Sequence, residues 1–142
     1  QCTKPYMASM FNISAMSFGS LSKNAILALN NGAKEGGFFH NTGEGGLSPY
    51  HLQGGDVAWN IGTGYFSCRN NNGTFNADEF QKRAILDNVK IIEIKFSQGA
   101  KPGHGGILPK EKVTDEIAAI RLVPKGKDIL SPPTHSAFSF FF

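Results

Sequence analysis

The chain has 142 residues, of which 40% are hydrophobic and 18% charged, and its formal net charge is +3. Length and composition indicate one folded domain and exclude a fibrous or disordered chain. The positive charge is small and includes no dense run of lysine and arginine, so we expect no nucleic-acid partner. A small anionic ligand suits this charge better.

Cysteine content and hydropathy exclude further classes of protein. Cys2 and Cys68 are too few and too far apart to build a zinc or iron–sulfur site by themselves. No apolar stretch approaches the ~20 residues of a membrane span, and the N-terminus lacks the pattern of a signal peptide. We expect a cytoplasmic protein with reduced thiols, no membrane partner and no iron–sulfur cluster encoded in this sequence.

The first predicted elements are a strand and a helix. Residues 11–17 are apolar and small, which is typical of a short strand. Ser22 is a natural N-cap for a helix over residues 23–35, whose apolar side chains share one face. The glycine pair at residues 36–37 would end that helix.

Two more strands are predicted before the middle of the chain. Residues 38–42 predict a second strand, and the glycine-rich residues 43–46 follow as its exit loop. Residues 59–66 predict a third strand, although two internal glycines weaken it. Asn76 then predicts the start of a helix that runs to about Asn88 and opens with a capping box.

Residues 89–96 are rich in β-branched side chains and predict a buried strand. Its alternation places Ile92, Ile94 and Phe96 on one face, which can pack under helices. The other face carries Ile91, Glu93 and Lys95. Glycines in the following run let the backbone approach a ligand closely. A structural ion pair between Glu93 and Lys95, followed by a flexible turn, is the alternative interpretation.

The succession of elements predicts an α/β fold. A short helix over residues 114–121 completes the alternation, which favours parallel strands joined by crossover helices. In a (β/α)₈ barrel, ligand groups lie at the carboxyl ends of strands. Five polar residues fall there: Ser17, Asn41, Glu44, Lys95 and Gln98. A complete barrel needs at least ~200 residues, so we expect a partial (β/α)₈ TIM barrel of about the first four βα units.

The C-terminal sequence also suggests a fragment. Residues 131–136 resemble an active-site loop, and four of the last five residues are phenylalanines. Exposed aromatic clusters promote association. We expect that further sequence normally follows, the alternative being that this tail packs against another surface.

Four motifs together resemble the FMN-binding synthase domain of the glutamate synthase family. They occupy residues 12–22, 41–46, 95–106 and 131–135, in the family's order. The resemblance is strongest to single-domain glutamate synthase-related proteins. It implies a lead-in over residues 1–10, followed at 11–142 by the N-terminal half of the family's barrel domain.

The resemblance implies flavin chemistry. Reduced FMN would pass a hydride to the imine formed from 2-oxoglutarate, or a related oxo-acid, and ammonia. The phosphate of FMN is expected to bind outside this chain, because barrel enzymes commonly place it on loops after strands seven and eight. The family's iron–sulfur ligands also lie beyond this span, and the electron donor stays open.

The resemblance also assigns site residues. Those expected to contact the flavin are Ala15, Met16, Ser17, Asn41, Thr42 and Lys95. Those expected to be catalytic are Lys95 and Glu44, and those expected to bind oxo-acid carboxylates are Gln98 and Lys101. The Lys95 cation would stabilise negative charge on the reduced ring. A structural alternative is that Glu44 only bonds backbone amides of its own loop.

Four positions depart from the glutamate-forming enzymes, one of them His104, where the family often has a glutamate. Leu47 replaces an acid, Ile107 replaces a glutamine and Tyr65 stands where an arginine helps to hold substrate. Loss of charged and amide groups weakens a dicarboxylate site. These departures leave the identity of the oxo-acid open.

Two hypotheses remain. The chain is either part of an FMN-dependent amine-forming oxidoreductase, or a truncated, non-catalytic remnant that acts only by association with a complementary chain. An exposed sheet edge would drive such an association, in particular with a C-terminal half-barrel.

Overall fold

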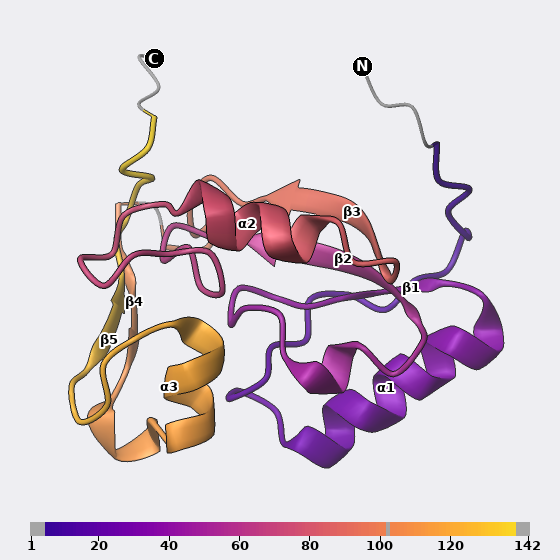
Figure 1. Ribbon diagram of the computed structural model, residues 1–142, viewed down its shortest axis with the longest axis horizontal. Helices are drawn as coiled ribbons and strands as arrows, with labels where there is room; N and C mark the ends of the chain where they lie inside the picture. The colour runs from indigo at the N-terminus through magenta and orange to yellow at the C-terminus, as the bar shows by residue number, and fades with distance from the viewer. Residues whose placement is uncertain (1–4, 102, 139–142) are drawn as a thin grey trace.

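A computed structural model describes residues 5–101 and 103–138 (Figure 1). The helices are α1 (Lys23–Gly36), α2 (Ala77–Ala84) and α3 (Asp115–Arg121), with 3₁₀ turns η1 (Pro49–His51) and η2 (Lys110–Lys112). The strands are β1 (Phe39–Asn41), β2 (Asp56–Ile61), β3 (Val89–Ile94), β4 (Gly106–Leu108) and β5 (Ile129–Ser131). The predictions on Cys2 and on the phenylalanines of 139–142 lie outside the described residues.

A parallel sheet of order β1-β2-β3 forms the centre of the fold and confirms the α/β class. Asn41 is in register with Ala58, and Ile61 with Ile94, so the carboxyl ends of the three strands meet at one edge. In the view of Figure 1, α2 lies over β2 and β3, whereas α1 and α3 lie on the lower side of the molecule. Among the described residues the sheet stays open and does not close into a barrel.

The C-terminal part departs from the predicted alternation. β4 and β5 pair with each other as an antiparallel ribbon, separate from the parallel sheet. Residues 109–128, which include α3, connect them. Pairing between strands this far apart in sequence leaves no local signal, so the sequence did not predict it.

The predicted first strand, over residues 11–17, is wrong as a regular strand. Only a parallel bridge between Ile13 and His40 forms. The segment still follows β1, because Asn41 N donates to Ile13 O at 3.0 Å and Met16 N donates to Asn41 O at 3.1 Å. Ser17 is thereby carried to the carboxyl end of β1.

The α1 boundaries confirm the prediction. Ser22 Oγ accepts a hydrogen bond from Ala25 N at 3.3 Å, and Gly37 ends the helix with φ +65°, a conformation that favours glycine. α3 likewise starts after Thr114, whose side chain accepts from Ile117 N at 3.2 Å. Both helices therefore begin after a residue whose side chain caps the first turn.

The predicted boundaries of two other elements need correction. α2 is capped by Asn76 as expected, but it ends at Ala84 rather than near Asn88. Glu79 does not complete a capping box, because its carboxylate binds Lys82 and Arg83, each at 2.6 Å. The lysine and arginine offer charged donors that the N-cap amide does not.

The third strand also differs from its predicted range. β2 covers Asp56–Ile61, and residues 62–66 form a turn instead of strand. Tyr65 N donates to Gly62 O at 3.1 Å, and Tyr65 and Ser67 have φ values of +50° and +69°. Ser67 is held there because its hydroxyl donates to Ile120 O at 2.7 Å and accepts from Leu47 N at 2.9 Å.

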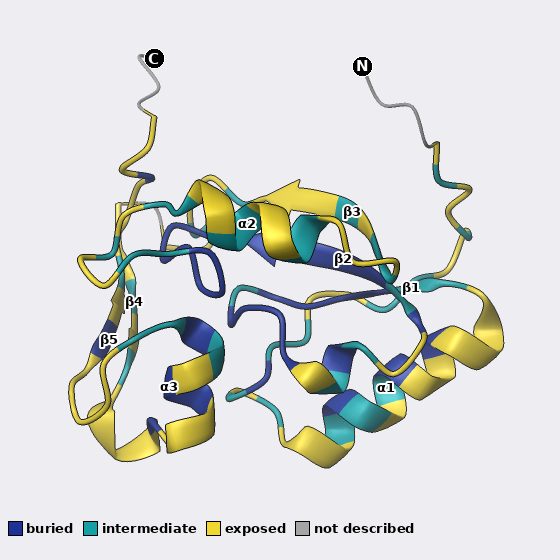
Figure 2. Ribbon diagram, in the orientation of Figure 1, coloured by how far each residue is buried: buried dark blue, intermediate teal, exposed yellow. Residues whose placement is uncertain are grey.

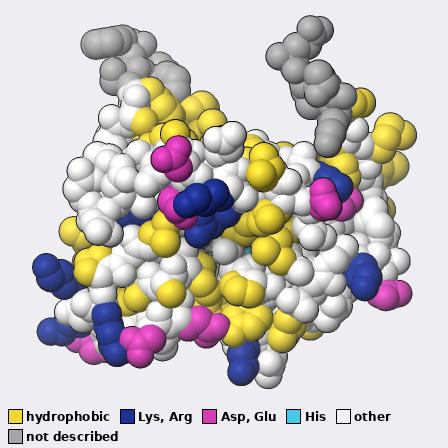
Figure 3. All heavy atoms as spheres, viewed as in Figure 1, with side chains coloured by type: hydrophobic (Ala, Val, Ile, Leu, Met, Phe, Trp, Pro, Cys, Tyr) yellow, Lys and Arg dark blue, Asp and Glu magenta, His cyan; other side chains and the backbone are white. Residues whose placement is uncertain are grey.

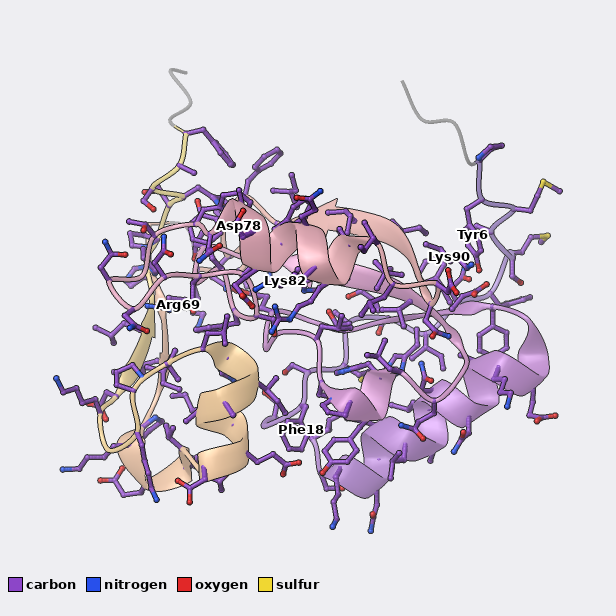
Figure 4. The ribbon with its side chains drawn as sticks, in the orientation of Figure 1. Tyr6, Phe18, Arg69, Asp78, Lys82 and Lys90 are labelled. Atoms are coloured by element: carbon purple, nitrogen blue, oxygen red, sulfur yellow. The ribbon has the colours of Figure 1, made fainter. Side chains whose placement is uncertain are left out.

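Two apolar clusters pack around the sheet. Trp59 of β2 is fully buried and stacks on Phe80 of α2, with ring centroids 5.6 Å apart. Phe18 belongs to the other cluster, with Ile26 of α1 and Ile117 of α3, and lies between these helices (Figure 4). Phe18 thus packs the segment that follows residue 17 against α3.

β3 is much more exposed than β2 (Figure 2). The apolar face predicted to pack under helices is largely open, since Ile92, Ile94 and Phe96 are 37%, 50% and 55% exposed. That part of the prediction is not met by the described residues. β3 is also an edge strand, because its only partner in the described sheet is β2.

Candidate functional site

A cavity of about 480 Å³ lies at the carboxyl edge of the parallel sheet. The sheet and its loops contribute Ala15, Ser17, Glu44, Asn60, Lys95 and Gln98, among others. Opposite elements contribute Arg121 from α3, Ile107 and Leu108 from β4, and Ile129 from β5. Segments distant in sequence therefore meet at one hollow.

Glu44, Lys95 and Gln98 form a hydrogen-bonded group that we call the rim cluster. The Lys95 ammonium binds the Glu44 carboxylate and donates to Gln98 Oε1 at 3.2 Å. Gln98 Nε2 donates to Glu44 Oε2 at 2.7 Å. The loop after β1 and the run after β3 thus face each other.

The rim cluster is only half-buried. The side chains of Lys95 and Glu44 are 36% and 27% exposed. Ion pairs with this much solvent contact contribute about 1 kcal/mol or less to stability. Stability alone is therefore a weak reason for placing these three side chains together in a cavity.

The alternative pair of Glu93 with Lys95 does not form. Glu93 instead accepts hydrogen bonds from Asn41 Nδ2, at 3.1 Å, and from Asn60 Nδ2. Asn41 Oδ1 accepts from Gly43 N at 2.9 Å. Glu93 and Asn41 thus fix the start of the glycine loop, while Lys95 stays available to the cavity.

The residues predicted to contact a flavin fall into two layers. Ala15, Ser17 and Lys95 line the cavity. Met16, Asn41 and Thr42 are not among its lining residues. Thr42 is fully buried, where its hydroxyl donates to Gly43 O at 2.9 Å and accepts from the backbone of β2.

The two residues predicted to bind carboxylates are also separated. Gln98 lines the cavity and belongs to the rim cluster. Lys101 is exposed and is not a lining residue, although its backbone amide donates to Gln98 O at 3.0 Å. The turn that joins the two residues directs only the Gln98 side chain into the cavity.

Glycine is required where the loop after β1 meets residues 17–18. A Cβ atom on Gly43 would lie 2.9 Å from Ser17 N, and this residue has φ +62°. A Cβ atom on Gly45 would lie 3.0 Å from Phe18 O. Side chains at these positions would push the loop away and fill the floor of the cavity.

A pair of buried histidines lies behind the wall of the cavity. His51 Nε2 is 3.0 Å from Met16 O and must donate to it, because a carbonyl only accepts; its Nδ1 accepts from Ser48 Oγ at 2.8 Å. The ring of His40 lies 5.1 Å from that of His51. Burial, reinforced by His51, lowers the pKa of His40 to about 4, and burial also lowers the pKa of His51.

Sequence reasoning missed Arg121. This side chain is 7% exposed, lies with its guanidinium carbon 4.9 Å from the centre of the Phe66 ring, and donates from Nη2 to Phe18 O at 3.3 Å. Its Nε is buried without a hydrogen-bond partner among the described residues. Burial lowers the pKa of Arg121 and Glu44 raises it, and arginine stays charged at neutral pH. In the sequence it is an ordinary basic residue at a helix end.

Tyr65 has a structural position rather than a place in the cavity. It is 2% exposed, accepts from Ala137 N at 3.2 Å and pairs with His135 Nδ1 at 2.9 Å. His135 Nε2 then donates to Lys95 O at 2.8 Å. The loop after β5 is thereby fixed to the backbone of Lys95.

Other features of the described chain give the surroundings of the site. On the face shown in Figure 3, basic and acidic side chains are interspersed. Cys68 is buried, which raises the pKa of its thiol to about 12, and the described residues contain no group of three possible metal ligands. Among the same residues no helix is long and apolar enough to cross a membrane.

Residues 2–140 match the family model described as a conserved region in glutamate synthase. The chain is 46% identical over 141 residues to the glutamate synthase large subunit-like protein YerD of Bacillus subtilis, covering 97% of this chain and 27% of YerD. It is 44% identical over 128 residues to the archaeal-type glutamate synthase (NADPH) of Thermotoga sp. strain RQ2, covering 88% and 22%. It is 39% identical over 132 residues to the glutamate synthase (NADPH) large chain of Bacillus subtilis, covering 88% and 8%. The chain thus spans less than a third of the length of these relatives.

Proposed function

Because the chain belongs to the glutamate synthase family, we propose that residues 11–142 are the N-terminal half of an FMN-binding barrel in an amine-forming oxidoreductase. The observation that carries this proposal is the rim cluster, in which a lysine, a carboxylate and an amide converge at the carboxyl ends of parallel strands. This edge is where α/β barrels place their active sites.

The lining residues suit the isoalloxazine ring of FMN. Ala15 and the glycines at 43 and 45 leave a wall without bulky side chains, against which a flat ring can lie. Lys95 supplies a cation, and Asn60 has a buried Oδ1 without a partner among the described residues. The donors and acceptors at the edge of the ring would meet these groups. When bound, FMN would supply the hydride that reduces an imine formed from an oxo-acid and ammonia.

We assign Lys95 to the polar edge of the ring. A fixed ammonium there stabilises negative charge that develops on reduction, because its position is set before the reaction. Its backbone is held by His135 and its side chain by Glu44. Met16, Asn41 and Thr42 support this wall from behind.

Glu44 and Gln98 are assigned to the substrate side of the cavity. Glu44 holds the Lys95 ammonium and the Gln98 amide at one place and offers the acceptor that an ammonium ion requires. Arg121, which the structure adds to this set, supplies a second cation for a carboxylate. Lys101 does not line the cavity, and its role in binding a carboxylate stays a prediction.

A second observation favours association with further polypeptide. Within the described sheet β3 is an edge strand, and its apolar residues Ile92 and Ile94 are 37% and 50% exposed. Such an edge is suited to pairing with another strand. We propose that a C-terminal half-barrel lies against β3, either as a continuation of the chain or as a complementary chain, and that it provides the phosphate site.

Flavin binding to the 142-residue chain tests the proposal. We expect the chain to quench the fluorescence of FMN and of riboflavin with equally weak dissociation constants, because the ring site lies here and the phosphate site does not. If the chain quenches the fluorescence of neither FMN nor riboflavin, the proposed ring site is contradicted. A preference for FMN of more than about ten-fold, or 1.4 kcal/mol, places the phosphate site within this chain and contradicts the half-barrel assignment.

A further inference from the structure

Tyr65 has a backbone conformation that its surroundings must enforce. Its φ is +50°, in the left-handed region that favours glycine, and the residue is 2% exposed. Strained backbone of this kind persists only where the surrounding structure fixes it, and it is common at functional sites. Tyr65 does not line the cavity. An effect of this residue on the site must therefore act through another residue.

The Tyr65 hydroxyl is connected to the backbone of Lys95 through His135. The Lys95 carbonyl oxygen only accepts, so His135 Nε2, at 2.8 Å, carries a hydrogen. Tyr65 Oη accepts from Ala137 N at 3.2 Å and, in the described chain, finds the acceptor for its own hydrogen in His135 Nδ1 at 2.9 Å. A second hydrogen on the His135 ring would leave the Tyr65 hydroxyl without that acceptor. The contacts therefore fit one tautomer, the neutral ring with its hydrogen on Nε2.

The backbone of Lys95 is fixed from two sides. Its N–H donates to Ile61 O at 3.0 Å, at the carboxyl end of β2, and its carbonyl accepts from His135. His135 is itself held by ring packing, since it stacks on Phe138 with centroids 4.6 Å apart. The direction of the Lys95 carbonyl sets the path of the chain from β3 to Gln98. Both rim-cluster side chains of this run thus depend on the His135 hydrogen bond.

The turn after β2 and the loop after β5 are also tied at a second point. Thr63 Oγ1 donates to Pro132 O at 2.5 Å. The backbone at Gly105 packs so closely against this loop that a Cβ atom there would collide with Ser131 O. The loop therefore stays beside the turn when the Tyr65 hydroxyl is removed, and such a variant should remain folded.

Building on the proposed function, we infer that Tyr65 is a positioning residue for Lys95, acting through the Nε2-protonated ring of His135. It fixes the path by which the chain leaves β3, and with it the place of the Lys95 ammonium beside Glu44 and Gln98. The inference rests on the proposed function only for the ligand that Lys95 meets. The position of the ammonium is a property of the free chain and is measured there.

The proton–nitrogen NMR spectrum of lysine ammonium groups tests the inference in the 142-residue chain. The Lys95 signal is identified by its loss in Lys95→Met. We expect Tyr65→Phe, which removes one hydroxyl, to move this signal toward those of exposed lysines. Tyr6→Phe is the matched control and should leave the signal in place, because the Tyr6 hydroxyl donates to Asp56 Oδ2 at 2.9 Å, at the opposite end of β2.

Two results of this measurement would overturn the inference. The first is an unchanged Lys95 signal in a Tyr65→Phe chain that circular dichroism shows to be folded. The second is a Lys95 signal that coincides with those of exposed lysines in the unmodified chain, since the ammonium would then not be held in one place.

Two variants of His135 separate the hydrogen bond from the packing of the ring. His135→Gln places an amide N–H near the position of Nε2 and can still donate to the Lys95 carbonyl, whereas His135→Leu cannot. We expect the glutamine variant to keep the Lys95 signal closer to its original position than the leucine variant does. Equal displacement in both variants would assign the effect to the lost ring and would overturn the role of the hydrogen bond.

Riboflavin quenching, measured on the same samples, separates this inference from the proposed function. We expect Tyr65→Phe to weaken riboflavin binding by at least about three-fold, an ordinary effect of one lost hydrogen bond, and Tyr6→Phe to bind like the unmodified chain. If Tyr65→Phe moves the Lys95 signal but no chain quenches riboflavin, the proposed function fails and the positioning of Lys95 stands. If the signal moves while the riboflavin affinity stays the same, the connection of Tyr65 to the ligand is overturned.

Discussion

Two polar clusters lie beside the same edge of the sheet but differ in burial and charge. The histidine cluster, made of His40, Ser48 and His51, is fully buried. Its His51 donates a hydrogen bond to the backbone oxygen of Met16. The rim cluster is half-exposed, charged and bonded from side chain to side chain. A neutral buried cluster holds the backbone in place, whereas a charged cluster open to a cavity is available to a ligand.

This difference predicts opposite consequences of mutation. Changes in the histidine cluster should lower stability and disturb the site only indirectly. Changes in the rim cluster should leave stability nearly intact and act on binding. The following experiments test this division, in order of expected size.

The largest effect is expected for His51→Ala. This variant removes two buried hydrogen bonds and leaves a void beside Met16, so we expect the free energy of unfolding to fall by about 3 kcal/mol in urea denaturation. Glu35→Ala, at an exposed position of α1, is the control and should change stability by less than about 0.5 kcal/mol. A loss below about 1 kcal/mol in His51→Ala would contradict a supporting role for the histidine cluster.

The pH dependence of stability should also follow the histidine cluster. His40 has a pKa of about 4 in the folded chain, against 6.5 for an ordinary histidine. Between these values the unfolded chain binds a proton that the folded chain does not, so stability is full above pH 6.5 and falls as the pH drops toward 4. We expect a loss of about 2 kcal/mol over this range and a flatter profile for His40→Leu. If stability changed with pH at the same slope in both chains, groups other than His40 would be responsible for the pH dependence.

A smaller change in stability is expected from the rim cluster. Lys95→Met removes a half-exposed ion pair and should lower the free energy of unfolding by less than about 1 kcal/mol. Thermal denaturation with and without salt measures this. A loss as large as that of His51→Ala would show that the rim cluster supports the fold, and the contrast between the two clusters would fail.

Local signals in the sequence predicted much of this arrangement. The cap at Ser22 and the glycine after α1 depend on neighbouring residues, and the structure confirms both. The meeting of Glu44 with Lys95 and Gln98 followed from the rule that parallel strands share a carboxyl edge. These features required no knowledge of distant contacts.

The features that were missed depend on long-range packing. Arg121 reaches the cavity because α3 packs against Phe18, which is 103 residues away. The antiparallel pairing of β4 with β5 and the turn at Tyr65 are likewise set by contacts with remote segments. The apolar face of β3 shows the reverse case, since its pattern predicts burial, whereas Ile92 and Ile94 are 37% and 50% exposed.

The most direct test of the account compares Lys95→Met with Lys101→Met in a riboflavin fluorescence titration. Both variants remove a lysine from the same glycine-rich run, but only Lys95 lines the cavity. We predict that Lys95→Met weakens riboflavin binding by at least about ten-fold, equivalent to 1.4 kcal/mol, while Lys101→Met binds like the unmodified chain. Equal binding by both variants, or a larger loss in Lys101→Met, would contradict the assignment of Lys95 to the flavin site.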